Sequence, residues 1–297
     1  MEYLYHYTSF SSLFNIVKTY RDSMDKDNII LWASHILNMN DPTEMYAGYK
    51  AIMKYLPLLE NKLNIEQDKR ISNLPNETQV HGLEQYEVDD LIMKGSFNSA
   101  YCPFVVSLSQ TMNSIPMWYM YADKGNGVCI AIDQDVLFDS LNKKWIPILV
   151  NYEYDILDNL LSETICGLIK ESYSLYFNSL NLKDDYMSLW NKKITHLKAM
   201  CTTISPFFKN EQFKFEKEMR IINYENDINN VNFRNRKGET LIPYVDFPVP
   251  VNSIKYIYLG PCVYSERNKE IMDSFIHTYM PNIEIEIIDS KIPIRNS

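Results

Sequence analysis

The sequence is poor in the residues and motifs that mark several classes of protein. Its 297 residues include only 8 glycines and 13 prolines, which excludes collagen-like and low-complexity chains. The five cysteines are scattered and form no Cys-x-x-Cys pair, so neither a disulfide framework nor a structural zinc site is expected. No run approaches the roughly 20 apolar residues that span a bilayer, and the start lacks the pattern of a signal peptide. We therefore expect a cytoplasmic protein with reduced cysteines.

Motifs for metal and nucleotide chemistry are also missing. The five histidines are scattered, with no His-x-x-x-His or His-Glu pair, and no acidic calcium loop occurs, so no metal cofactor is expected. The phosphate-binding patterns Gly-x-x-x-x-Gly-Lys-Ser/Thr and Gly-x-Gly-x-x-Gly are absent, which excludes P-loop and Rossmann proteins. The sequence also contains no Gly-x-Ser-x-Gly elbow, the motif that would indicate a serine nucleophile.

The composition suits a folded protein with an acidic surface. Hydrophobic residues make up 46% of the chain, which is enough for one large or two modest domains. The 38 acidic and 29 basic side chains give a net charge of -9 at pH 7. This balance disfavours a surface that binds nucleic acid or an anionic membrane broadly, although it leaves room for a local basic groove.

Short runs rich in strand-forming residues alternate with amphipathic segments, which predicts an α+β fold. Ser9 is a candidate N-cap for one helix, and Ser114 with Pro116 begins another. Strands are expected at 3–8, 29–33, 104–108, 128–132, 148–154, 213–222, 254–259 and 283–288, and helices after Ser9, at 44–56, after Ser114 and as a pair within 156–205. The polar stretch 60–95 is predicted to be an insertion or a mobile loop.

The segment 213–222 carries the densest charge pattern. As a strand it places Glu216, Glu218 and Arg220 on one face. Arg220 could then hold one carboxylate ionised while the other works in a cleft. The alternative interpretation is an exposed strand whose charge pairs contribute little.

Two further side chains are candidates for ligand contacts. His6 lies in the run Tyr5–Ser9 and could donate a hydrogen bond to a ligand hydroxyl, or it could simply fill the core or surface. Tyr121 follows Trp118 on the short helix and could stack on a planar cationic ring, or both could be core packing.

Several short segments also form an ordered set. They are Tyr5–Ser9, Leu31–Ser34 followed by Asn38–Glu44, Val106–Ser109, Pro116–Asp123 with Gly127–Asp133, the Phe215-Glu-x-Glu-x-Arg220 run, and Ile257–Pro261. In this order, over about residues 3 to 295, they resemble the bacterial domain-of-unknown-function family 2971 (DUF2971). That family is similar in turn to the ADP-ribosyltransferase superfamily, whose fold is a split β-sheet with NAD between its halves.

The resemblance implies a site in which NAD is the substrate and no metal takes part. Glu218 would stabilise positive charge on the ribose, and Glu216 would orient an acceptor, although the strand register leaves open which of the two is catalytic. The other residues implied in NAD binding are His6 at the adenosine-side ribose with Tyr7, Thr8 and Ser9 beside it, Ser34 from the second-strand motif, Tyr121 stacked on nicotinamide, and Arg220 holding the carboxylates.

The function implied is ADP-ribosyl transfer to a protein or a nucleic acid, as in a toxin or an anti-phage effector. Two alternatives remain open: an NAD glycohydrolase, and a non-catalytic module that senses a nucleotide or binds a partner. We expect one ADP-ribosyltransferase-like domain over 1–297, with a polar insertion at 60–95 and a helical insertion at about 156–205 that could bind a partner.

Overall fold

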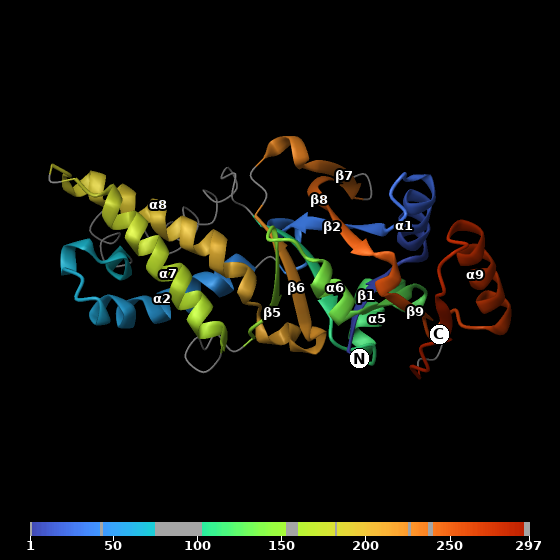
Figure 1. The fold of residues 1–297 in the computed structure, drawn as a ribbon. Coiled ribbons are helices and arrows are strands. Elements are labelled where there is room, and N and C mark those ends of the chain that lie inside the picture. Colours follow the sequence, from blue (N-terminus) through green and yellow to red (C-terminus); the bar gives the residue numbers. More distant parts are fainter. Residues whose placement is uncertain are drawn as a thin grey trace.

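The computed structural model describes residues 2–41, 44–74, 103–152, 160–181, 183–224, 227–236 and 240–293 (Figure 1). Its strands are β1 (Tyr3–Thr8), β2 (Asn28–His35), β3 (Phe104–Ser109), β4 (Val128–Asp133), β5 (Trp145–Leu149), β6 (Glu218–Asn223), β7 (Asn232–Arg236), β8 (Thr240–Pro250), β9 (Ile254–Leu259) and β10 (Glu286–Asp289). Its α-helices are α1 (Phe10–Asp22), α2 (Glu44–Lys62), α5 (Ile115–Tyr121), α6 (Gln134–Ser140), α7 (Leu160–Ser179), α8 (Tyr186–Ile204) and α9 (Glu266–Tyr279). The strands form one mixed sheet, so the expected α+β class is confirmed.

The order of strands divides the sheet around β3. Along the main path the order is β10-β9-β4-β1-β3-β2-β8-β7, and β3 also pairs with β6, which pairs with β5. Strand β3 meets β1 at Tyr5–Ser109 and meets β2 near its other end, at Ser34–Val105. Because β1 and β2 are joined to opposite ends of β3, they diverge along the rest of their length.

The larger apolar core lies against the sheet. Ser9 caps α1 by accepting a hydrogen bond from the backbone N–H of Ser12, as its sequence predicts. The buried face of α1, with Leu13 and Val17, packs into this core together with residues of α6 and α9. These helices hold one face of the sheet that contains β1.

The helices α2, α7 and α8, which we call the helical lobe, have a second core and lie at one end of the molecule (Figure 1). The helix pair expected within 156–205 is confirmed as α7 and α8. The lobe packs closely on the segment that follows α8: a Cβ added to Gly48 of α2 would lie 2.2 Å from the Oγ of Ser205. The apolar residues Val105, Ile148 and Ile222 of the sheet join this core. The lobe is therefore packed directly against the strands β3, β5 and β6.

The prediction of a strand over residues 213–222 is wrong for the first half of that segment. Residues Glu211–Glu216 form a 3₁₀ helix that Asn210 caps, and β6 begins only at Glu218. Lys217 between them has left-handed backbone angles (φ 44°, ψ 54°), which lie outside the β region and interrupt a regular strand. The two glutamates therefore meet across a turn, and not as alternate residues of one strand.

Other boundaries also differ from expectation. The strand expected at 148–154 is shifted, since β5 ends at Leu149, and residues 153 and 154 lie outside the described residues. The β7–β8 hairpin was not expected, because Pro243, Pro248 and Pro250 argue against a strand. Of the expected insertion at 60–95, residues 75–95 lie outside the described part of the chain. No helix among the described residues is both long and apolar enough to cross a membrane.

Candidate functional site

The diverging strands enclose a cavity of about 360 Å³. This volume falls in the range of about 300–1,000 Å³ that is usual for small-molecule sites. The cavity is lined by residues of β1, α1, β2, the segment 38–40, β3 and α5, together with Lys209, Glu216, Glu218 and Arg234. A single cavity thus draws on segments that are distant in the sequence.

Most of the residues predicted for the site line this cavity. They are His6, Tyr7, Thr8, Ser34, Tyr121, Glu216 and Glu218. The other two lie outside its lining: Ser9 caps α1, and Arg220 is fully buried beside Glu218. The structure therefore brings the predicted residues together, while their roles stay predictions.

Glu218, the first residue of β6, is held by four donors. Arg220 donates from Nε to Oε1 (2.9 Å) and from Nη2 to Oε2 (3.1 Å), Lys209 Nζ lies 3.0 Å from Oε2, and the Ser107 hydroxyl donates to Oε1. Burial alone would raise the pKa of this carboxyl, but the charges of Arg220 and Lys209 outweigh burial and lower the pKa to about 2. Glu218 is a fixed anion at neutral pH.

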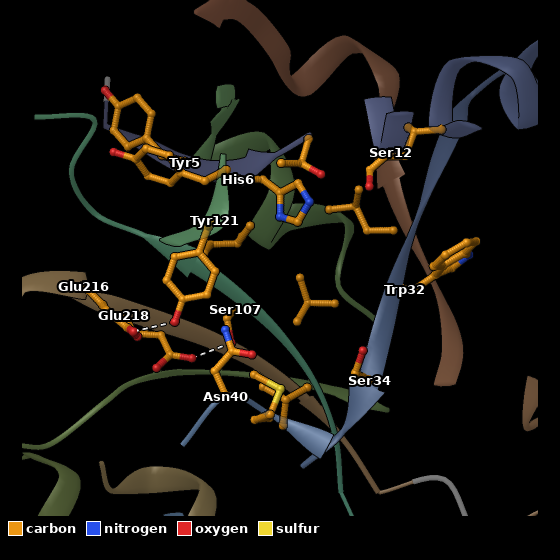
Figure 2. A pocket seen from close by; sticks show the side chains of 18 of the residues that line it. Tyr5, His6, Ser12, Trp32, Ser34, Asn40, Ser107, Tyr121, Glu216 and Glu218 are labelled. Atoms are coloured by element: carbon orange, nitrogen blue, oxygen red, sulfur yellow. Dashed lines mark hydrogen bonds between the residues drawn. The ribbon is translucent and has the colours of Figure 1, made fainter. Parts of the chain in front are cut away.

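Glu216 has a different environment, although it shares Lys209. The Tyr121 hydroxyl donates to Oε1 (2.6 Å), and Lys209 Nζ donates to Oε2 (2.6 Å), as Figure 2 shows for the tyrosine. Burial raises the pKa of Glu216, the negative charge of Glu218 adds to this, and Lys209 acts in the opposite direction. The pKa values of the two neighbouring carboxyl groups are thus shifted in opposite directions, which is a common arrangement in acid–base sites.

The burial of this cluster excludes the exposed-strand interpretation of its charges. Glu216 is 3%, Glu218 2%, Lys209 2% and Arg220 0% exposed. Four charged groups that are this deeply buried are rare unless they are paired, and here each carboxylate contacts a cation.

Lys209 is the cluster member that the sequence did not indicate. It follows the 3₁₀ helix Ser205–Phe207 after α8, and the chain there is tied to the end of β5 by a bridge between Asn151 and Phe208. No spacing rule links a lysine at this position to Glu216 and Glu218. The sequence shows only that Lys209 directly follows the apolar run Pro206–Phe208.

His6 lies on the same side of the cavity as Tyr121 (Figure 2). Burial lowers the pKa of its imidazole to about 4, and a hydrogen bond with the backbone of Ser107 acts weakly in the opposite direction. The ring is therefore neutral at pH 7 and carries one donor and one acceptor nitrogen. Such a ring suits hydrogen bonding to an uncharged hydroxyl.

The opposite wall of the cavity is aromatic and cationic. Trp32 is 44% exposed and lies with Ser34 on β2, on the side of the cavity opposite Glu216 and Glu218 (Figure 2). Arg234 of β7 donates from Nη2 to the Ser34 hydroxyl (3.0 Å), and its guanidinium carbon lies 5.5 Å from the centre of the Trp32 ring. Arg234 was missed because β7 was not predicted.

The chemistry available is acid–base and electrostatic. A fixed carboxylate, a second carboxylate with raised pKa, a tyrosine hydroxyl and a neutral imidazole face one space. Within the described residues there is no group of three or more His, Cys, Asp or Glu side chains that could hold a metal ion. The residues present can stabilise a developing positive charge and move a proton.

Comparison with protein families gives a match over part of the chain. Residues 117–221 match the model of the family described as Protein of unknown function (DUF2971), which confirms that resemblance over this segment. The segment contains Tyr121, Lys209, Glu216, Glu218 and Arg220 and ends inside β6. No curated protein and no solved structure matches the chain, and the resemblance to ADP-ribosyltransferases stays a prediction.

Proposed function

We propose that this DUF2971-related chain cleaves the bond between nicotinamide and ribose in NAD and transfers ADP-ribose to a macromolecule. One observation carries the proposal: His6, Tyr121 and Glu218 come from distant parts of the chain and line the same cavity. These are the residues that the resemblance assigns to the adenosine-side ribose, to nicotinamide and to the ribose cation.

The electrostatics of Glu218 fit the demands of this reaction. When the glycosidic bond breaks, nicotinamide leaves with the bonding electron pair, and positive charge develops at C1′ and the ring oxygen of the ribose. A carboxylate that stays ionised and cannot rotate stabilises that charge without reorganising. Arg220, Ser107 and Lys209 hold Glu218 in this state.

Glu216 suits the second half of the reaction. The acceptor's nucleophilic atom attacks C1′ and must lose a proton, which a neighbouring carboxylate can accept. A pKa that burial raises makes Glu216 the better base of the two. The Tyr121 hydroxyl orients it, and the Tyr121 ring remains available at the cavity wall for stacking.

The direct test is the release of nicotinamide from NAD by the purified protein. Wild-type protein is expected to release nicotinamide, and His6→Leu, whose side chain cannot hydrogen-bond, is expected to lower kcat/KM about tenfold, the value of one lost ligand hydrogen bond. His277→Leu is the matched control, because His277 is exposed on α9 and does not line the cavity. Nicotinamide release that is absent in wild type, or equal in all three proteins, contradicts the proposal.

Transfer and hydrolysis are separated by the fate of ADP-ribose. In a transferase, label from adenine-labelled NAD becomes attached to protein or nucleic acid in a cell extract. In a glycohydrolase, all of it remains as free ADP-ribose. Both reactions use the same first step, so this assay follows only if nicotinamide is released.

One observation favours a non-catalytic nucleotide-binding module. Lys209 contacts both carboxylates, and its positive charge partly cancels the negative potential that a ribose cation needs. A module of this kind binds NAD and leaves it intact under all conditions.

Binding without turnover can be followed through Trp32. Because Trp32 is 44% exposed and lines the cavity, NAD is expected to quench the protein's fluorescence, and Trp32→Phe is expected to remove most of the change. Trp190→Phe, in the helical lobe, is the control and should keep the quenching. Quenching that survives in Trp32→Phe would place the ligand elsewhere.

A further inference from the structure

We infer that Lys209 is a positioning residue of this site, whose ammonium group holds Glu216 and Glu218 together and keeps both of them ionised. The role of Glu216 and Glu218 in NAD cleavage rests on the proposed function. The claim that Lys209 holds these two carboxylates does not. Neither the sequence motifs nor the family description points to this residue.

The contacts of Lys209 place its charge between the two carboxylates. Its Nζ lies 2.6 Å from Oε2 of Glu216 and 3.0 Å from Oε2 of Glu218. The ring of Phe213 covers the ammonium group from another side, with its centre 5.0 Å away. At 2% exposure, Lys209 is shielded from solvent, so these interactions are stronger than those of a surface pair.

The balance of charge explains why the cation is needed. Arg220 contacts Glu218 through Nε and Nη2, and its Nη1 donates to the carbonyl of Pro206 (2.9 Å). Lys209 is the cation that contacts Glu216 in the described structure. Removing its charge leaves two buried carboxylates against one guanidinium, and a proton on Glu216 is the least costly way to restore neutrality.

The groups that face Glu216 come from several elements. Besides Lys209, they are Glu218 of β6, which favours protonation, and the hydroxyl of Tyr121 on α5, which donates to the ionised form. The hydroxyl of Tyr152, after β5, accepts a hydrogen bond from the backbone N–H of Glu218 (2.9 Å). Lys209 is thus the positive charge that opposes the effect of Glu218.

The backbone around Lys209 is fixed on two sides. Its N–H donates to the carbonyl of Asn151 (3.1 Å), and the N–H of Asn151 donates to the carbonyl of Phe207 (2.9 Å). These two backbone hydrogen bonds with Asn151, just after β5, fix the backbone position from which the lysine side chain extends. The segment also continues directly from α8 through the 3₁₀ helix Ser205–Phe207, so it connects the helical lobe to the site.

The test compares Lys209→Met with Lys209→Arg and reads protonation directly. The side-chain carboxyl carbon of Glu216, labelled with ¹³C and assigned by its loss in Glu216→Gln, is titrated by NMR. In Lys209→Met the midpoint is expected to rise by about 1–3 pH units, and in Lys209→Arg to stay near the wild-type value. Lys193→Met is the matched control, because Lys193 is also buried but belongs to the helical lobe.

The catalytic consequence has its own readout. The acid limb of the pH profile for ADP-ribosyl transfer is expected to move upward with the Glu216 midpoint in Lys209→Met. At neutral pH, kcat for transfer is expected to fall about 10- to 100-fold while KM for NAD changes little, because the lysine orients catalytic groups and not the ligand. Lys209→Arg is expected to recover most of the rate.

The outcomes separate the two claims. An unchanged Glu216 midpoint in Lys209→Met overturns the inference, whatever the activity. A shifted midpoint in a protein that never releases nicotinamide supports Lys209 and contradicts the proposed function. If Lys209→Met does not fold, the double variant Lys209→Met/Glu216→Gln is expected to fold, since it removes both partners. Failure of the double variant to recover the fold also counts against the inference.

Discussion

Glu218→Gln is expected to lower the rate of nicotinamide release by about 10²–10³-fold, the usual cost of removing one electrostatic group that acts on the transition state. The amide keeps the shape of the side chain and can still accept from Ser107 and Arg220, but it carries no charge to stabilise the ribose cation. The measurement is kcat at saturating NAD, with KM expected to change much less.

The same substitution also affects stability, and the experiment must account for this. Glutamine at 218 leaves Arg220 and Lys209 against the single carboxylate of Glu216, and breaking a buried ion pair from one side costs about 3–5 kcal/mol. Thermal melting therefore has to establish a temperature at which the variant is folded before rates are compared. A folded variant with the wild-type rate would remove Glu218 from the mechanism.

Glu216→Gln is the matched comparison for this prediction. It removes the neighbouring carboxylate from the same cavity and the same lysine. If Glu216 serves the acceptor, this variant keeps nicotinamide release and loses ADP-ribosyl transfer. The reverse pattern, with release lost in Glu216→Gln and kept in Glu218→Gln, would exchange the two roles.

Acidification from pH 7 to pH 4 is expected to destabilise the fold by about 3 kcal/mol for each of two histidines, the partly buried His6 and the buried His35. Burial lowers the pKa of each ring from 6.5 to about 4. Between these values the unfolded chain binds a proton that the folded chain does not. The stability contributed by each neutral ring is therefore complete above pH 6.5 and is lost as the pH falls toward 4.

His35 provides the clean test of this effect, because it does not line the cavity. Its Nδ1 accepts a hydrogen bond from the backbone N–H of Leu37 (3.3 Å), a contact that the oxygen of asparagine can replace. In His35→Asn the free energy of unfolding, measured with urea at both pH values, is expected to fall by about 3 kcal/mol less than in wild type. An equal fall in both proteins would show that His35 is not held neutral.

Glu216 and Glu218 add a further pH dependence to the stability of the fold, at lower pH. The depressed pKa of Glu218 contributes stability above pH 4.5 that is lost as the pH falls through about 2. Glu216 has a raised pKa, so its protonation on acidification acts in the opposite direction. The loss expected between pH 6.5 and 4 therefore belongs mainly to the histidines.

Local pattern predicts the parts of this fold that local forces determine. The strands β1, β4 and β9 lie where the sequence places them, and Ser9 caps α1 as expected, because strand propensity and capping act within a few residues. The strand β8 was not predictable in this way. It contains three prolines, yet it pairs with β2 and β7, and its place depends on partners elsewhere in the chain.

The candidate site illustrates the same limit. Glu216, Glu218 and Arg220 were identified from their spacing, but the spacing implied a strand face, whereas the structure uses a 3₁₀ helix and a left-handed Lys217. Lys209 and Arg234 could not be identified, because their contacts with Glu216, Glu218 and Ser34 exist only after distant segments have packed. Tertiary packing determines which charges meet.

The pairing of distant strands in the mixed sheet has a consequence for when the protein can act during its own synthesis. The strand β2, which carries Trp32 and Ser34, pairs with β8, and Arg234 of the cavity lining lies on β7, which also pairs with β8. Chains fold as they leave the ribosome, and contacts between such distant segments form late. A partly synthesised chain therefore cannot assemble this cavity. If the chain consumes NAD, a ribosome that stalls before β8 releases no active fragment.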